Sequence, residues 1–275
     1  MRESASVMAM NLKPRLRHAK QSGGASYRLS QCDQKLEIPT AQLERNGIAL
    51  LTIIAAPLYR ELEVTPMALK LTMFSDFICP FCYIGFEVVR KLKPEFDIEL
   101  DWRGYQIHPE WPVEGIPASE YRSMDAATQR QVWERIQSLA NDAGFAMKPP
   151  EMLMNSRRAL EAAEFAKQAG AGEAFEERVY RAYFQEGLNI GDAGVLADLA
   201  HNVGLSRSEL DQALATNRYS MKIKNAALAA HQRGVSGVPT FFVGNFPMVG
   251  AQSETVMRQL LTRAVERLDV IQAAD

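Results

Sequence analysis

Apolar and polar positions first form a regular pattern near residue 68. Alternation over 68–74 predicts a strand. A helical spacing of apolar residues follows from about Cys79, and Pro94 is expected to end that helix. A second strand is predicted over 98–106. Together these elements have the order and the size of a βαβ unit.

The middle of the chain, roughly 111–233, carries mainly helical periodicity. Glycines follow several of the apolar runs, and Ser206 with Glu209 has the spacing of a capping box. The expected helices run from a cap at Ser156 to Gly170, around Phe175 to Phe184, from Val195 to Gly204, after Ser206, and from about Tyr219 to Gln232.

Strand patterns return near the end of the chain. Thr240 to Val243 and Pro247 to Val249 flank Gly244-Asn245, which predicts a hairpin, and a final helix carries Val256 to Leu268. The predicted order is βαβ, helices, then ββα, so an α/β fold with a helical insertion is expected. The expected divisions are 1–66, 67–110, 111–233 and 234–270.

Residues 1–66 show no sustained helical or strand pattern, and we expect them to be poorly ordered. The first residues do not resemble a secretory signal. The apolar run Ile48 to Ala56 is shorter than the roughly 20 residues that span a bilayer. A natural start at Met67 is an alternative that the sequence leaves open.

Composition narrows the function classes. The chain has 275 residues, 47% of them hydrophobic, and a formal net charge of −2. This balance gives no indication of a nucleic-acid partner, because such proteins usually carry a basic surplus. The three cysteines, Cys32, Cys79 and Cys82, are too few for a secreted disulfide framework. No membrane segment is predicted, and a cytoplasmic location is expected.

The pair Cys79-Pro80-Phe81-Cys82 is expected to open a helix directly after a strand. Free backbone N–H groups and the helix dipole favour an anion at that position, so the pKa of the Cys79 thiol should be low. Cys82 would lie deeper and attack a mixed disulfide formed on Cys79. Pro80 and Phe81 offer the thiolate no side-chain donor, which predicts a pair less oxidising than the strongest oxidants of this chemistry.

Other uses of the two cysteines were weighed. Zinc would need two further ligands, and His18, His108, His201 and His231 show no suitable spacing, so no metal site is predicted. Two buried, inert thiols are the other alternative. The adjacent proline and the strand–turn–helix setting argue against it.

Gly234 to Thr240 contains a second candidate, Val238-Pro239. If that peptide bond is cis, the backbone of Val238 can face the dithiol and pair with an extended substrate. An ordinary loop proline is the equally open alternative.

The two motifs, in this order and around a helical segment, resemble the DsbA-like family of thioredoxin-fold proteins, and most closely its FrnE-like branch. The resemblance covers about 69–268. It rests on Ser75 to Gly85, Trp102-Arg103, His108-Pro109, Ala182 to Asp192, Gly234 to Pro239 and Val249 to Gln252.

This resemblance implies a thioredoxin-like fold, with Cys79 as nucleophile, Cys82 as resolving thiol and Pro239 as a cis-proline preceded by Val238. It also implies that Pro80, Phe81, Val238 and Pro239 contact substrate. The 2-hydroxychromene-2-carboxylate isomerases are a sister group that binds glutathione and usually carries Ser at the position of Cys79. The FrnE-like branch is generally cytoplasmic.

Three hypotheses follow. The first is a thiol–disulfide oxidoreductase or disulfide isomerase that acts on protein or small-molecule thiols, needs no bound cofactor and is recycled by glutathione. The second is a glutathione-dependent isomerase of a small aromatic compound. The third is a non-catalytic binding module or chaperone.

Several other residues have two interpretations. His108 could handle protons, although a surface loop is favoured, and Asp76 could relay a proton for Cys82, although a polar residue that ends a strand is slightly favoured. Arg157-Arg158 is interpreted as a solvated face, and Cys32 receives no role. The aromatic residues expected to pack in the core or between domains are Trp102, Trp111, Tyr180, Tyr183 and Phe184.

Overall fold

The computed structural model describes residues 68–121 and 125–272. The predicted extension 1–66, with Cys32 and the apolar run Ile48 to Ala56, lies outside these ranges. In chain order the elements are β1 (Leu69–Ser75), α2 (Pro80–Phe96), β2 (Ile98–Gly104), β3 (Ile116–Pro117), α3 (Ala126–Asp142), β4 (Met152–Leu153), α4 (Arg157–Gln168), α5 (Gly172–Arg181), the π-helical turn η2 (Ala182–Glu186), α6 (Ala193–Asn202), α7 (Arg207–Ala215), α8 (Ser220–Gln232), β5 (Thr240–Val243), β6 (Phe246–Val249) and α9 (Glu254–Gln272).

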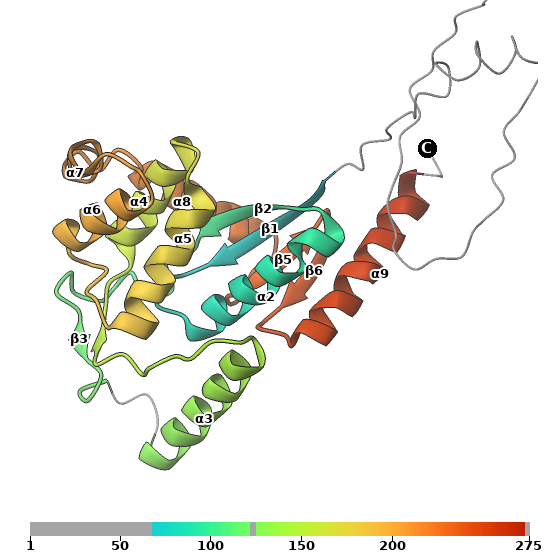
Figure 1. The fold of residues 1–275 in the computed structure, drawn as a ribbon, viewed down its shortest axis with the longest axis horizontal. Helices are drawn as coiled ribbons and strands as arrows, with labels where there is room; N and C mark the ends of the chain where they lie inside the picture. Colours follow the sequence, from blue (N-terminus) through green and yellow to red (C-terminus); the bar gives the residue numbers. More distant parts are fainter. Residues whose placement is uncertain (1–67, 122–124, 273–275) are drawn as a thin grey trace, which may run out of the picture.

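A four-stranded sheet in the order β2-β1-β5-β6 forms the centre of the molecule (Figure 1). β1 pairs in parallel with β2, from Leu69 opposite Ile98 to Ser75 opposite Gly104. Its other edge pairs antiparallel with β5, where Leu71 lies opposite Val243. β1 therefore joins the two halves of the βαβ…ββα pattern, and the predicted α/β fold with a helical insertion is confirmed.

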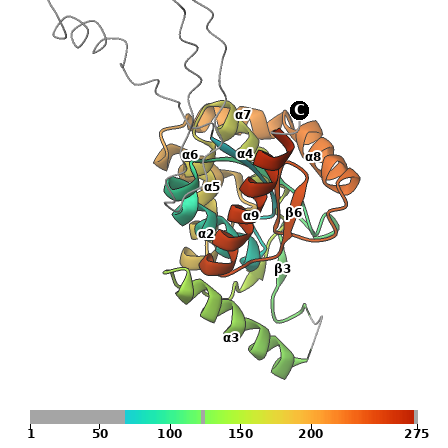
Figure 2. The ribbon, with the colours of Figure 1, turned by 90° about the vertical axis from the view of Figure 1, so that its right-hand side faces the viewer.

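Side chains alternate across this sheet and bury both faces. Leu71 and Met73 of β1, with Phe241 of β5, belong to the main core, which α2 and α9 cover. Phe74 and Phe242 point to the other face, where they pack with Ala230 of α8. Figure 2 shows α8 on the side of the sheet away from α2. The helix assigned by sequence to the insertion thus covers the second face of the central sheet.

The helix after the dithiol is longer than predicted. Pro94 was expected to end it, but α2 continues to Phe96, and this prediction is wrong. A proline in the last turn removes only one hydrogen bond, and Asp97 closes the helix in the left-handed conformation with its N–H on the carbonyl of Lys93. β2 is shorter than predicted, because pairing with β1 ends at Gly104.

The helices between Ser156 and Gln232 lie where the periodicity predicts them, and α4 to α7 gather at one end of the sheet (Figure 1). Ser206 caps α7 by accepting a hydrogen bond from the N–H of Glu209 at 3.3 Å, as the capping box requires. Ser156 precedes α4 as expected, but its side chain makes no capping hydrogen bond. The helix α3 and the short strand pair β3–β4 have no counterpart among the predicted elements.

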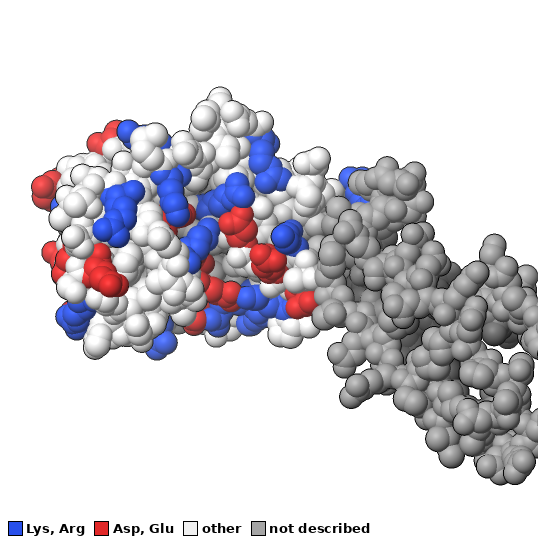
Figure 3. All heavy atoms as spheres, turned by 90° about the horizontal axis from the view of Figure 1, so that it is seen from above, with Lys and Arg blue, Asp and Glu red and all other residues white. Residues whose placement is uncertain are grey.

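Lysine and arginine side chains are interspersed with acidic ones on the face that Figure 3 shows. Ion pairs in the described part of the chain include Lys167 with Asp101 at 3.2 Å and Arg157 with Glu161 at 2.7 Å. Among the described residues, no helix is both long and apolar enough to cross a membrane.

Glu176 is a buried carboxyl group within the helical segment. Its side chain on α5 is 2% exposed, and burial raises its pKa from 4.5 to about 8, although Lys167 opposes this rise. Glu164, Glu173 and Asp101 raise the pKa further. Because the folded pKa exceeds the unfolded one, the folded state binds this proton more tightly, and stability is lost as the pH rises toward 8.

We therefore expect Glu176→Gln to remove part of the pH dependence of unfolding. Relative to the wild type, the free energy of unfolding of the variant should rise between pH 5 and pH 8 by at least about 1 kcal/mol. Urea denaturation at several pH values measures this difference. Glu266→Gln, at an exposed position of α9, is the matched control. Parallel pH curves for all three proteins would contradict the prediction.

Candidate active site

Cys79 stands at the N-cap of α2, between the end of β1 and the first helical turn. Its backbone is extended, with φ −90° and ψ 114°, and Pro80 follows at the first helical position. Pro80 suits this position because an N–H there has no partner within the helix. The N–H of Cys79 donates to the carbonyl of Asp76 at 3.2 Å. The strand end and the helix start thus hold the first thiol in the predicted place.

The two thiols are free, and their surroundings separate their pKa values. Hydrogen bonding from the Cys82 thiol lowers the pKa of Cys79, with help from backbone N–H groups at the helix start, although burial opposes this. Cys79 is 7% exposed, whereas Cys82 is fully buried, and burial raises the pKa of Cys82 well above its ordinary value. One thiol is therefore activated and the other is held protonated.

The loop before β5 lies against the first thiol. The Val238–Pro239 peptide bond is cis, and the Cys79 thiol donates to the Val238 carbonyl at 3.7 Å. Gly85 on α2 permits this close approach, because a Cβ there would lie 2.8 Å from the ring of Phe241 and 3.4 Å from Pro239. The two motifs found in the sequence therefore meet. The roles of Pro80, Phe81, Val238 and Pro239 toward substrate stay predictions.

Asp76 lies beneath the dithiol and is 0% exposed. Its carboxylate accepts hydrogen bonds from the N–H groups of Ile107 at 2.8 Å and Ile78 at 3.4 Å. Burial nevertheless raises its pKa from 3.8 to about 6, against these bonds and the nearby Ser156 hydroxyl. A proton-relay role of Asp76 toward Cys82 stays a prediction.

An aromatic side chain from the helical segment packs against the residues on either side of the dithiol. Tyr180 is fully buried, stacks on Tyr83 with 5.1 Å between ring centroids, and meets Phe77 edge-on. Its hydroxyl lies 2.5 Å from the Ser75 hydroxyl. Trp102 stacks on Phe77 at 4.7 Å. The predicted packing roles of Tyr180 and Trp102 are confirmed.

An apolar cleft of about 570 Å³ opens beside the dithiol. Ile78 and Pro80, the two chain neighbours of Cys79, form part of its wall. The remaining wall residues are Trp111, Ala118, Ser119, Tyr121, Gln129, Arg130, Val132, Trp133, Pro149, Pro150, Leu153 and Phe184. Phe184 was predicted to pack rather than to face substrate, and it is both buried and part of this wall.

The part of this wall that comes from α3, namely Gln129, Arg130, Val132 and Trp133, was not predicted from the sequence. The signal was present, since Val132, Trp133, Ile136 and Leu139 have helical spacing. Trp111 also lines the cleft, and His108 stacks on it at 3.9 Å between ring centroids. The His108 ring is 28% exposed and bonds to Glu110 at 2.8 Å, away from the dithiol contacts described above.

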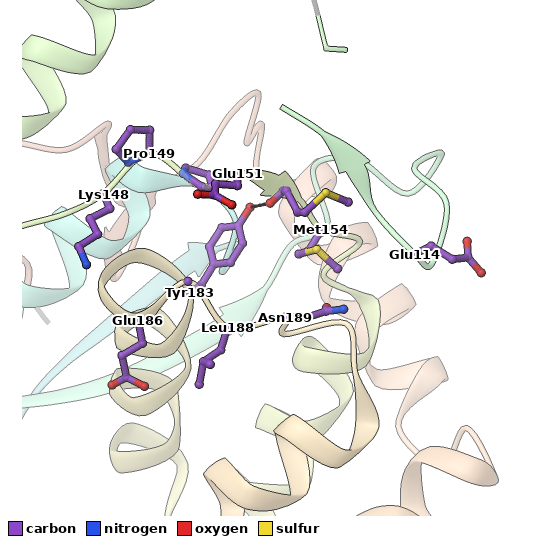
Figure 4. A pocket seen from close by; sticks show the side chains of 12 residues that line it. Glu114, Lys148, Pro149, Glu151, Met154, Tyr183, Glu186, Leu188 and Asn189 are labelled. Carbon is purple, nitrogen blue, oxygen red and sulfur yellow. Dashed lines mark hydrogen bonds between the residues drawn. The ribbon is translucent and has the colours of Figure 1, made fainter. Parts of the chain in front are cut away.

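A second, more polar pocket of about 390 Å³ lies near η2 (Figure 4). Tyr183 crosses it and donates its hydroxyl to the carbonyl of Met152 at 2.9 Å. This bond ties η2 to β4, in agreement with the predicted packing role of Tyr183. Figure 4 shows the carboxylates of Glu114 and Glu186 at opposite ends of the pocket, so they do not converge on one point.

Arg157 and Arg158 are held by the protein itself. Arg157 pairs with Glu161 and donates to the carbonyl of Ser220, and Arg158 donates to the carbonyl of Gly191. Within 68–121 and 125–272, no three His, Cys, Asp or Glu side chains are grouped so as to hold a metal ion.

We expect Asp76→Asn to lower the pKa of Cys79, because the Asp76 carboxylate opposes ionisation of that thiol. Above pH 6, where Asp76 is charged, the variant should react faster with iodoacetamide at Cys79. Below pH 6, where Asp76 is protonated, the two rates should converge. Peptide mapping by mass spectrometry gives the rate at each cysteine. Asp142→Asn, at an exposed position, is the control. Equal rates for Asp76→Asn and wild type at pH 8 would contradict the prediction.

Comparison with known proteins agrees with this geometry. YwbO of Bacillus subtilis (strain 168), an uncharacterised protein, is 28% identical over 200 residues, which are 71% of this chain and 97% of YwbO. A probable DsbA oxidoreductase from Streptomyces coelicolor has a TM-score of 0.66 at 24% identity, over 71% of this chain and 89% of that one.

Two further solved structures share the fold. A 2-hydroxychromene-2-carboxylate isomerase has a TM-score of 0.60 at 18% identity, over 74% of this chain and 98% of that one. The cytosolic disulfide reductase DsbM from Pseudomonas aeruginosa, solved with GSH, has a TM-score of 0.53 at 16% identity, over 74% and 100%. The model of the DSBA-like thioredoxin domain matches residues 70–262, and the chain belongs to that family.

Proposed function

We propose that the chain is a thiol–disulfide oxidoreductase or disulfide isomerase that works through Cys79 and Cys82. The observation that carries this proposal is the pair of unlike thiols at the start of α2. Cys79 has a lowered pKa and a narrow opening to solvent, while Cys82 is fully buried with a raised pKa. This division suits a nucleophile and a resolving thiol.

In the proposed cycle, the Cys79 thiolate attacks one sulfur of a substrate disulfide. The substrate S–S bond breaks, one substrate thiolate leaves, and a mixed disulfide joins Cys79 to the other half. Cys82, as thiolate, then attacks the Cys79 sulfur and releases the second half. The enzyme ends as a disulfide, and the substrate gains two electrons and two protons.

Cys82 needs a base before it can attack, because burial holds it protonated. Asp76 is the proposed proton acceptor, since it is buried beneath the dithiol and its pKa of about 6 leaves it charged at neutral pH. The Val238 carbonyl, which the Cys79 thiol contacts, is the proposed docking point for the substrate backbone, beside Pro80, Phe81 and Pro239.

The oxidised pair must be reduced again, and glutathione is the proposed reductant. A related fold, the disulfide reductase DsbM, has been solved with GSH, which supports this choice. The proposed setting is the cytoplasm, with protein or small-molecule thiols and disulfides as partners. No other bound cofactor is required for thiol–disulfide exchange.

A glutathione-dependent isomerase of a small aromatic compound is the second candidate. The 2-hydroxychromene-2-carboxylate isomerase fold similarity and the aromatic cleft beside Cys79 favour it. That chemistry has no use for a second thiol. If Cys82→Ser keeps a glutathione-dependent isomerase activity, the isomerase is the correct function. If Cys82→Ser loses disulfide reductase activity, the redox enzyme is the correct function.

The central test is the equilibrium reduction potential of the pair, titrated against glutathione. We expect a reversible two-electron couple that Cys79→Ser abolishes and Cys32→Ser leaves unchanged. Cys82→Ser should instead trap glutathione as a mixed disulfide on Cys79. If no disulfide forms between Cys79 and Cys82 across the glutathione range, the redox function is wrong.

The residues between the cysteines set the potential. With Phe81 in place, we expect a value more negative than about −120 mV, that of the strongest oxidant of this chemistry. Phe81→His should make the pair more oxidising by about 30 mV or more, because the imidazole can stabilise the Cys79 thiolate. Phe81→Leu is the control, since it keeps an apolar side chain. An unchanged potential in Phe81→His would show that this position does not tune the pair.

A further inference from the structure

We propose that the cleft beside the dithiol selects small disulfides that carry an aromatic ring and a carboxylate. The proposal rests on the redox function proposed above and names its substrate class. The cleft holds about 570 Å³, which is within the range of pockets that bury a small organic ligand.

The cleft wall favours a flat aromatic group. Trp111, Tyr121, Trp133 and Phe184 contribute four aromatic side chains from four separate parts of the chain. Aromatic rings pack against such walls in offset or edge-on arrangements that add to the free energy of simple burial. Two of the three tryptophans in the protein, Trp111 and Trp133, line the cleft, where Trp111 was expected to pack in the core or between domains.

The position of the cleft fits a substrate of Cys79. Ile78 and Pro80 both line it, so the thiol lies within one residue of the wall on either side. Cys79 itself is only 7% exposed. A small disulfide fits within the volume of the cleft, where one of its sulfurs can lie next to this thiol.

The positive charge of Arg130 at the cleft indicates that the ligand carries a carboxylate as its second group. Among the described residues that line it, Arg130 is the only one that carries a formal charge. Arg130 is an exposed residue of α3 and borders a cleft whose wall is mainly apolar. A guanidinium there can bind a carboxylate in a bidentate manner while the ring occupies the interior.

The chemical step is the reduction of the small disulfide. The Cys79 thiolate attacks one substrate sulfur, the substrate S–S bond breaks, and an aromatic thiolate leaves. Aromatic thiols have low pKa values and are good leaving groups in this exchange. Cys82 then gives its proton to Asp76, the base proposed above, and displaces the second aromatic thiolate. Both products leave as thiolates, because the pKa values of their thiols are low. The enzyme becomes oxidised, and glutathione returns the two electrons.

Binding can be tested apart from redox chemistry. In the full chain with Cys79→Ser and Cys82→Ser, isothermal titration calorimetry would compare three probes: dithiodibenzoate, which is aromatic and acidic, bis(hydroxyphenyl) disulfide, which is aromatic and neutral, and dithiodibutyrate, which is aliphatic and acidic. We expect saturable binding of dithiodibenzoate, about tenfold tighter than that of the aliphatic acid.

Two further substitutions in that double variant locate the site. Trp133→Ala should weaken the binding of dithiodibenzoate about tenfold, because the contact with the indole ring is lost. Arg130→Gln, at an exposed position where folding is not at stake, should weaken dithiodibenzoate about fivefold and leave the neutral aromatic probe unchanged. Val256→Ala, at an exposed apolar position on α9, is the control for Trp133→Ala and should change nothing.

The outcomes separate the two proposals. Absent binding, equal affinity for all three probes, or indifference to Arg130→Gln would overturn the substrate class and leave the redox function standing. A wild-type protein with no Cys79–Cys82 couple would instead overturn the redox function. The absence of this couple would also overturn the proposed reduction of small disulfides. Selective binding by the double variant would then show a binding site for aromatic acids that takes no part in redox chemistry.

Discussion

The burial of the dithiol is the constraint on which the chemistry of the site depends. Cys82 and Asp76 have no exposed surface, and Cys79 has very little. In such surroundings a thiolate or carboxylate is stable only where a hydrogen-bond donor contacts it. Cys79 has the Cys82 thiol and the free N–H groups of the helix start, so its pKa falls. Cys82 has much less compensation and stays protonated. One environment thus gives two identical side chains different chemistry.

Residues of the helical segment contribute to this burial, so the segment is part of the site. Tyr180 of α5 lies under the dithiol, where its hydroxyl meets Ser75 and its ring packs against Tyr83 and Phe77. Without these rings, water would reach Cys82 and Asp76, and their pKa values would return toward ordinary ones. The segment between β2 and β5 therefore shields the dithiol from water and, through α3, forms part of the wall of the cleft.

Much of this arrangement could be predicted from the sequence because local signals agreed with one another. Strand alternation, the proline after Cys79 and the capping box at Ser206 each determine structure over a few residues, and the matched motifs supplied the fold. Three features could not be found in this way. The length of α2 past Pro94 depends on the closing bond at Asp97. The cleft depends on packing of α3 beside α2. The Asp76 carboxylate accepts a hydrogen bond from the N–H of Ile107, which is distant in sequence.

The pairing of β1 with β5 also determines when the site can exist during synthesis. Phe74, at the end of β1, pairs with Thr240, so the wall that shields Cys79 comes from a part of the chain made long after the cysteine itself. Contacts of such large sequence separation form late in folding. A nascent chain therefore carries an unshielded dithiol while the helical segment is translated. Its chemistry over that interval is that of an ordinary exposed thiol pair, open to any oxidant or metal ion near the ribosome.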